Sequence, residues 1–141
     1  MARVSFYLNF QGQTEEAFAL YAKAFNSEVS MLQRFSEVPQ NPEAPLPDDE
    51  LNLVMHAEMP IMGGAVLMAT DMLKSMGHQV RIGNNTTINL EPDTLEEAQR
   101  IYDVLSVDST EGMPIAPMFW GAHWGVLLDK YGIRWMFNVA G

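Results

Sequence analysis

Two stretches of this chain, Asn9–Tyr21 (NFQGQTEEAFALY) and Asn89–Tyr102 (NLEPDTLEEAQRIY), match each other with one inserted residue. Both place Asn and an apolar residue first, then Thr, then Glu-Glu-Ala, and in both a Tyr follows that Ala by four residues. Because any amphipathic helix start favours Thr and Glu, the letters alone are a weak signal. The same order of strand and helix patterns follows each copy, so the match indicates an internal duplication.

Each copy opens with a strand that leads into a helix. Alternation of apolar and polar residues over 3–10 predicts a half-buried strand, with Phe6, Leu8 and Phe10 on one face. Thr14 is placed to cap a helix that runs to Phe25, and Thr94 with Glu97 forms a capping box for a helix to about Leu105. Further strands are predicted over 28–34, 51–59, 65–69, 86–90, 118–128 and 133–139.

These elements predict an α+β fold of two βαβββ modules, about 1–72 and 84–141, joined by 73–83 within a single domain. The sheets are expected to curl as one mixed sheet around a cavity, with the helices on the outer face. The segment 39–49 holds four of the eight prolines and is expected to be an exposed loop, because proline cannot donate to a strand ladder.

The composition narrows the classes of function. Eight basic and eighteen acidic residues give a formal charge of −10, which disfavours a nucleic-acid partner. Cysteine is absent, so disulfides, thiolate metal sites and a cysteine nucleophile are excluded. The sequence shows neither a secretory signal nor an apolar run long enough for a membrane helix, so no membrane partner and a cytoplasmic location are expected.

The segments YLNFQGQTEEAFALYAKAF, VMHAEMPIMGGAVLMATD and FWGAHWGVLLDKYGIRWMFN resemble the glyoxalase/bleomycin-resistance/dioxygenase (vicinal oxygen chelate) superfamily. More narrowly they resemble its PhnB-like branch, often labelled 3-demethylubiquinone methyltransferase-like. The resemblance covers nearly the whole chain and implies two βαβββ modules around a cavity. It also implies a homodimer.

Enzymes of this superfamily usually hold one divalent metal through side chains on the first and last strands of each module. The positions that match here are Ser5, Met68, Thr87 and Met136. Hydroxyls bind divalent metals weakly and thioethers suit soft ions, so the usual metal site is predicted to be absent and no cofactor is expected.

Two histidines remain as weak candidates for catalysis. His56 and Glu58 stand two residues apart on one strand face, where they suit an acid–base pair, half of a metal site, or a plain hydrogen-bonded pair. A two-residue turn at Gly63-Gly64 would put them on the face opposite Met68, whereas a three-residue or bulged loop would put them on the same face. His123 lies between Trp120 and Trp124, where neighbouring glycines leave room for a ligand.

Strand alternation predicts that one face of each sheet is apolar and packs on a helix, while the other is polar and lines the cavity. Amides, hydroxyls and one Arg on that face suit a small organic ligand. The residues predicted to contact it are Tyr7, Asn9, Met68, Thr87, Asn89, Trp120, His123, Trp124, Arg134, Met136 and Asn138. Arg134 is expected to pair with an anionic ligand group, or with Glu58 or Glu91.

Two functions therefore compete. The first is a metal-free protein that binds a small organic molecule, as resistance-type members of the superfamily do. The second is an enzyme of the lyase, isomerase or dioxygenase type, which uses either a metal-free mechanism or a non-standard metal site built on His56, Glu58 or His123. A literal methyltransferase is disfavoured, because no Gly-rich turn that could hold an adenosyl cofactor joins a parallel strand to a helix.

Overall fold

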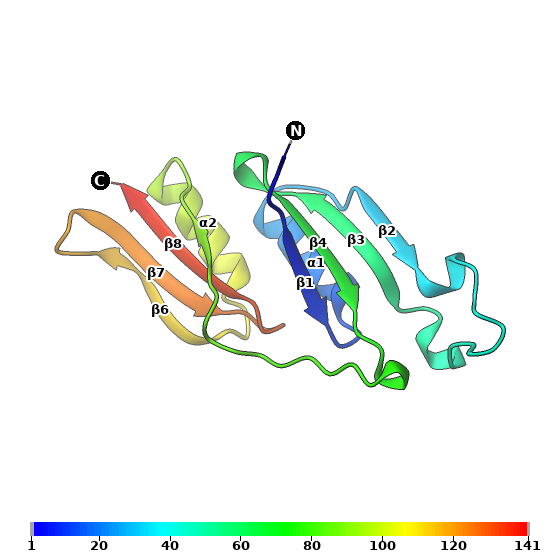
Figure 1. Cartoon of the computed structure of the whole chain (residues 1–141). Helices are drawn as coiled ribbons and strands as arrows, with labels where there is room; N and C mark the ends of the chain where they lie inside the picture. The colour runs from blue at the N-terminus through cyan, green and yellow to red at the C-terminus, as the bar shows by residue number, and fades with distance from the viewer. Residues whose placement is uncertain (1, 141) are drawn as a thin grey trace. The chain divides into compact units, whose positions relative to one another are not determined.

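The computed structural model describes residues 2–140, which form two helices and two four-stranded mixed sheets (Figure 1). The chain divides into two compact units. One comprises the residues up to 22 together with 26–81, and the other comprises 23–25 together with the residues from 82 onward. Across 2–140, no helix is long and apolar enough to cross a bilayer.

The first unit contains β1 (Phe6–Phe10), α1 (Thr14–Ala24), β2 (Met31–Arg34), β3 (Val54–Pro60) and β4 (Val66–Asp71). The strand order is β1-β4-β3-β2, in which β1 runs parallel to β4 and the other neighbours are antiparallel. Short 3₁₀ turns lie at 35–37, 48–50, 62–64 and 74–76.

The second unit repeats this plan. Its elements are β5 (Ile88–Leu90), α2 (Leu95–Leu105), β6 (Thr110–Pro117), β7 (Ala122–Leu128) and β8 (Arg134–Ala140). Residues 23–25, which include the last residues of α1, also belong to this unit. The order β5-β8-β7-β6, with β5 parallel to β8, is the order of the first sheet with each strand replaced by its counterpart. The predicted α+β fold of two βαβββ modules is confirmed, whereas the shared cavity and the single domain stay predictions.

In each unit a helix covers the apolar face of a sheet, as alternation predicted. From α1, Phe18 and Tyr21 are fully buried, and from α2, Ile101 and Leu105 are. Burying each such side chain contributes about 1.5–3 kcal/mol, so these faces hold the units together. The strand residues buried on the same faces include Phe10, Met59 and Leu67 in the first unit and Leu127, Trp135 and Phe137 in the second. The predicted cap is also present: the Thr94 hydroxyl accepts the backbone N–H of Glu97 at 3.1 Å.

A buried carboxyl group ties the first unit together. Asp71, at the end of β4, is 3% exposed and accepts hydrogen bonds from the Thr14 backbone N–H at 3.0 Å and the Thr14 hydroxyl at 2.7 Å. Its other oxygen accepts the Val54 backbone N–H at 2.8 Å. One side chain therefore joins the starts of α1 and β3 to the end of β4, satisfying donors that burial would otherwise leave unpaired.

Asp129 organises the turn between β7 and β8, the role that its position in DKYG favours. It is 4% exposed, and one oxygen accepts the backbone N–H groups of Tyr131 at 2.8 Å and Ile133 at 3.0 Å. The other accepts the indole N–H of the fully buried Trp135 at 2.8 Å.

The sequence missed one strand and misplaced another. The missed strand is β6, which contains Pro114 and Pro117; it lies at the edge of its sheet, where proline is tolerated because one side of the strand needs no ladder partner. The predicted strand 118–128 begins only at Ala122. Residues 118–121 form the tight turn of the β6–β7 hairpin, closed by the Met118 N–H donating to the Ala122 carbonyl at 2.8 Å.

Candidate functional site

The face of the first sheet opposite α1 is polar and open to solvent. Tyr7 pairs with Met68 in the β1–β4 register, and Met68 pairs with Glu58 in the β4–β3 register, so these three side chains stand side by side on it. The described strand residues that share this face by register and alternation are Tyr7, Asn9, Met31, Gln33, His56, Glu58, Pro60, Val66, Met68 and Thr70. Among them there is no Lys or Arg.

The turn between β3 and β4 places His56 and Glu58 on this face. Pro60 pairs with Val66, and the Ile61 N–H donates to the Ala65 carbonyl at 2.9 Å, so the 3₁₀ turn 62–64 lies outside the ladder. Of the two registers open from the sequence, the longer loop is therefore the one present. His56 and Glu58 share the face of Met68.

Three polar side chains on this face form a hydrogen-bonded chain. The Tyr7 hydroxyl lies 3.3 Å from His56 Nδ1, and His56 Nε2 lies 2.9 Å from a Glu58 carboxylate oxygen. An ionised carboxylate can only accept, so the neutral tautomer that fits this contact has its proton on Nε2, which leaves Nδ1 as the acceptor for the Tyr7 O–H. Tyr7 is half exposed, while the side chains of His56 and Glu58 are 21% and 27% exposed. The phenol is thus the accessible end of the chain.

This order of groups resembles a catalytic triad in its logic. A hydroxyl meets one imidazole nitrogen, and a carboxylate holds the other nitrogen and fixes the tautomer. Among the described strand residues of this sheet, the cation is Arg34, and it is turned away. It binds Glu15 of α1 at 2.8 Å, and that hydrogen bond raises the pKa of the guanidinium. Among the described strand residues of the open face, the charged one is therefore Glu58.

The open face of the second sheet carries polar groups that are largely engaged. Arg134, whose side chain is 13% exposed, donates to Glu111 at 3.0 Å and to the Gly83 carbonyl at 2.8 Å. Its partner is thus Glu111, and neither Glu58 nor Glu91 as the sequence suggested. Asn89 donates to Glu91 at 2.9 Å.

The remaining predicted contacts on this second face follow from register. Asn89 stands beside Met136, and Trp124 stands beside Asn138. Thr87 is exposed immediately before β5. Their role as ligand contacts stays a prediction.

The structure separates the three residues of the FWGAHWG stretch. His123 pairs with the buried Val139, so it lies on the helix-covered side of the sheet, whereas Trp124 pairs with Asn138 on the open side. Trp120 is 52% exposed in the 118–121 turn, with its ring edge-to-face against Phe119 at 5.0 Å between centroids. The three therefore do not line one pocket together, because neighbouring strand residues point to opposite faces and Trp120 precedes the strand.

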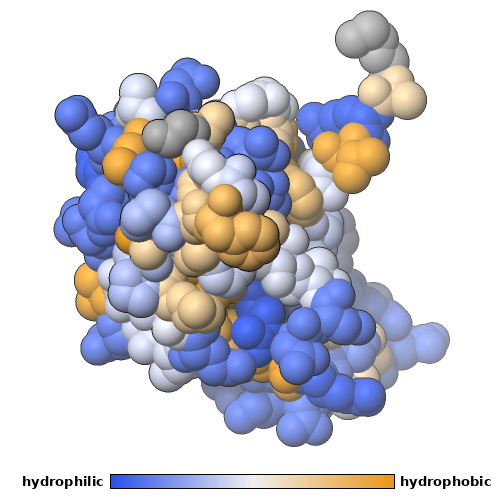
Figure 2. All heavy atoms as spheres, turned by 90° about the vertical axis from the view of Figure 1, so that its left-hand side faces the viewer, coloured by the Kyte–Doolittle hydropathy of each residue, from blue (hydrophilic) through white to orange (hydrophobic). Residues whose placement is uncertain are grey.

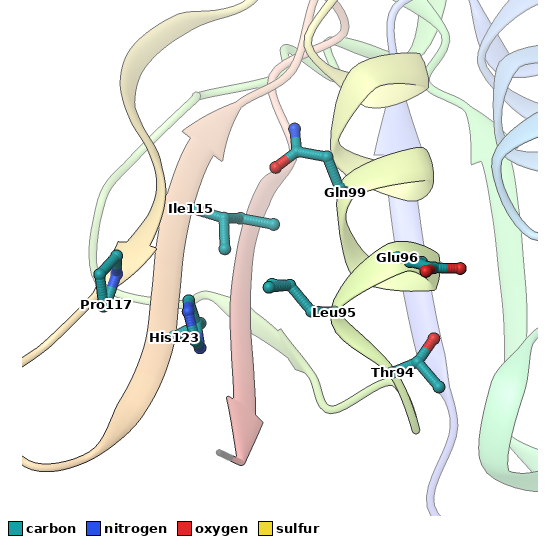
Figure 3. Close-up of a pocket in the computed structure, with 7 residues that line it drawn as sticks. All are labelled: Thr94, Leu95, Glu96, Gln99, Ile115, Pro117 and His123. Atoms are coloured by element: carbon teal, nitrogen blue, oxygen red, sulfur yellow. The ribbon is translucent and has the colours of Figure 1, made fainter.

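A hollow of about 740 Å³ lies beside His123, between the start of α2 and the strands β6 and β7 (Figure 3). Leu95 and Gln99 of α2 point toward Ile115 and His123, while Glu96 points away from them. Its lining residues are Thr94, Leu95, Glu96, Gln99, Ile115, Pro117 and His123. Sequence reasoning missed this hollow, because two of its residues stand on the unpredicted strand β6 and His123 was assigned to the polar face.

Gly125 shapes the wall of the hollow. A Cβ at this position would lie 2.8 Å from Ile115 Cγ1 and 2.9 Å from the Ile115 backbone nitrogen, so only glycine lets β6 approach β7 this closely.

Figure 2, which views the molecule from the left-hand side of Figure 1, shows hydrophobic side chains at the surface among hydrophilic ones. Exposed apolar residues of the second unit include Val107, Met113, Phe119 and Trp120.

Hydroxyls and thioethers stand at the positions that the sequence resemblance matches to the superfamily's metal ligands. In the first unit, Ser5 Oγ lies 3.9 Å from Met68 Sδ, which brings together a hydroxyl and a thioether. Thr87 and Met136 offer the same two groups in the second unit. Within residues 2–140, no three His, Asp or Glu side chains come together in a way that could hold an ion.

Known proteins are similar to this chain in sequence, and two of them have solved structures with the same fold. Protein YjdN of Escherichia coli (strain K12) is 26% identical over 142 residues, covering 94% of this chain and 92% of that protein. The crystal structure of protein PA1353 from Pseudomonas aeruginosa superposes with a TM-score of 0.84 at 28% identity, covering 99% of this chain and 98% of that one. The PhnB protein from Bacillus cereus has a TM-score of 0.78 at 25% identity and covers 99% and 100%.

More distant structures share the fold alone. A glyoxylase/bleomycin resistance protein/dioxygenase domain from Frankia sp. EAN1pec has a TM-score of 0.65 at 10% identity, covering 100% of this chain and 97% of that one. The family model of 3-demethylubiquinone-9 3-methyltransferase matches residues 2–137. The chain therefore belongs to the 3-demethylubiquinone-9 3-methyltransferase family, with the PhnB-like form of the glyoxalase/bleomycin-resistance/dioxygenase fold.

Proposed function

We propose that this protein binds a small organic molecule on the polar open face of the first sheet and does so without a divalent metal. The observation that carries the proposal is the Tyr7–His56–Glu58 chain, which ends in a half-exposed phenol on that face. Such a chain holds the exposed phenol oxygen in one position, where it can accept a hydrogen bond from a ligand. Binding sites commonly combine apolar surface with a few oriented polar groups of this kind.

The neighbouring side chains favour a neutral ligand. Asn9 and Thr70 offer an amide and a hydroxyl, and Met31 and Met68 offer adaptable apolar surface. Glu58 is the charged group among the described strand residues of the face, so a carboxylate or phosphate ligand would meet its repulsion there. Hydroxyl, carbonyl and amide compounds fit these groups better.

The methyltransferase in the family's description is not carried over to this chain. Both sheets have the order of a βαβββ repeat, in which the last strand lies between the first and third, and neither is a doubly wound parallel sheet with a cofactor crevice. The homodimer and the cytoplasmic location also remain proposals, the first of which size-exclusion chromatography with light scattering would test.

Metal content is expected to be close to zero. Because the four superfamily positions hold two hydroxyls and two thioethers, protein purified without chelator should contain far less than one metal per chain, even after incubation with Mn²⁺, Ni²⁺ or Zn²⁺. Elemental analysis of untagged protein measures this. A value near one per chain, lost in His56→Ala or His123→Ala, would contradict the proposal and favour the metal enzyme.

Ligand binding is expected to map to the open face of the first sheet. Small neutral amides, hydroxyketones and phenols, titrated into ¹⁵N-labelled full-length protein, should shift the amide signals of 7–9, 56–58 and 68–70. The affinity obtained from these shifts should fall at least about tenfold in Tyr7→Ala, since the lost hydrogen bond and ring contact together contribute more than about 1.4 kcal/mol.

Glu28→Gln provides the matched control for Glu58→Gln, because Glu28 is an exposed acid outside the face. Glu58→Gln should alter ligand binding, whereas Glu28→Gln should not. Shifts confined to the hollow beside His123, or no shifts with any of these compounds at millimolar concentration, would overturn the assignment of the site.

A further inference from the structure

We propose that Tyr7 acts as a general base toward a neutral carbonyl compound bound on this face, with His56 as the proton acceptor and Glu58 as the group that holds His56 in place. This inference rests on the proposed function, because the compound must first bind on the face. It assigns to the site a proton transfer, a metal-free activity that goes beyond binding.

The hydrogen-bond geometry carries this inference. A phenol alone is a poor base at neutral pH, because its proton must leave before its oxygen can accept another. Here the Tyr7 oxygen lies 3.3 Å from His56 Nδ1, so the phenol proton has an acceptor at a distance within the looser range that catalytic hydrogen bonds show before substrate arrives. The 2.9 Å contact of Nε2 with Glu58 fixes the tautomer in which Nδ1 is free to accept.

The proton transfer balances within these three residues. The Tyr7 oxygen takes a proton from the carbon next to the substrate carbonyl as the phenol proton passes to His56 Nδ1. The C–H electron pair becomes part of the enolate, and the imidazolium that forms is paired with the Glu58 carboxylate. The acidic protons on the Tyr7 oxygen and on His56 exchange with water while the enolate is bound. Reprotonation by the same route then places a solvent hydrogen on the carbon, so the net process is exchange of the α-hydrogen with solvent.

The face also offers a group for the carbonyl oxygen. Asn9 lies two residues from Tyr7 on the same strand, so both side chains project from the same side about 7 Å apart. Its amide N–H groups can donate to the oxygen on which charge develops, which is the position where a donor lowers the barrier. The absence of Lys and Arg among the described strand residues of this face favours an uncharged substrate.

A purely structural role explains this arrangement less well. A hydrogen bond between partly exposed side chains contributes only about 0.5–1.5 kcal/mol, so Glu58 and His56 gain little stability from their contact. The partners also stand on different strands, since Tyr7 comes from β1 and His56 from β3, with β4 between them. The Tyr7 side chain extends across β4 to contact the His56 ring, as expected for a phenol that is positioned next to a proton acceptor.

The test is hydrogen–deuterium exchange of hydroxyacetone and dihydroxyacetone, two neutral hydroxyketones. Full-length protein in D₂O should accelerate loss of their α-proton NMR signals, and Tyr7→Phe should reduce the acceleration about 100-fold, the lower range for general-base catalysis. His56→Gln should reduce it similarly. Glu58→Gln should reduce it less, and Glu28→Gln should leave it unchanged.

Binding of the same hydroxyketones, measured by amide shifts, separates the two proposals. Bound compound with no acceleration, or equal acceleration in Tyr7→Phe, overturns the base role of Tyr7 and leaves the binding face standing. Acceleration that disappears in Tyr7→Phe while binding persists supports the base role. If neither hydroxyketone binds or exchanges, the proton transfer is overturned, and the binding proposal is judged by the amides and phenols.

Discussion

Replacing Asp71 by Ala is expected to lower the free energy of unfolding by about 3–5 kcal/mol. The substitution leaves the backbone N–H groups of Thr14 and Val54 without their acceptor in a buried position, and each such loss costs about 1–3 kcal/mol. It also releases the buried Thr14 hydroxyl. Urea unfolding followed by circular dichroism measures the change.

Two further variants make this result specific to the hydrogen bonds. Asp49→Ala removes an exposed carboxylate of the same chemistry and should change the free energy by less than about 0.5 kcal/mol. Asp71→Asn keeps one acceptor oxygen but turns an NH₂ group toward a donor, so its loss should fall between those of the other two. A loss below 1 kcal/mol in Asp71→Ala would mean that water or a shifted backbone replaces the carboxyl group.

The fold was accessible from the sequence because its periodic signals are local. The cap at Thr94 and the alternation around Phe6–Phe10 mark their elements directly, and the repeated pattern of Thr followed by Glu-Glu-Ala indicates the duplication. The strand β6 was not predicted, because its prolines are not tolerated in a central strand. Only the completed sheet order shows that it is an edge strand, and that order depends on long-range pairing.

The candidate site was accessible only in part. Alternation placed Tyr7, Asn9 and Met68 on one face, as the register shows. The face of His56 depended on the turn at 61–65, where a change of one residue in register reverses every side chain of the strand. The contact between Tyr7 and His56 could not be predicted, because it joins residues 49 positions apart across an intervening strand.

The position of His123 was likewise not predictable, because the face of a strand residue depends on where the strand begins. Its strand was predicted to begin at Met118, but Met118–Gly121 is a turn, so no alternation runs through the aromatic stretch from its start. Aromatic residues and glycines together suggested a pocket, yet they serve three different places: a hairpin tip, a helix-covered face and an open face. Composition alone does not distinguish these positions.

In the second unit, replacing Asp129 by Ala is expected to cost about 3–4 kcal/mol of unfolding free energy. The turn loses the acceptor for Tyr131 and Ile133, and the indole N–H of Trp135 loses this acceptor at a fully buried position. Asp129→Asn keeps an oxygen for the turn but presents either an NH₂ or a rotated oxygen to the indole, so about half of the loss should remain.

The coupling between Asp129 and Trp135 distinguishes the indole bond from the turn. Trp135→Phe removes the buried donor, so adding Asp129→Asn to that variant should cost about 1–2 kcal/mol less than it costs in the native chain. Four urea titrations, of the native chain, the two single variants and the double variant, measure this coupling. Additive losses would show that the indole finds another acceptor once the carboxyl group is gone, and that the turn bonds to Tyr131 and Ile133 carry the whole contribution of Asp129.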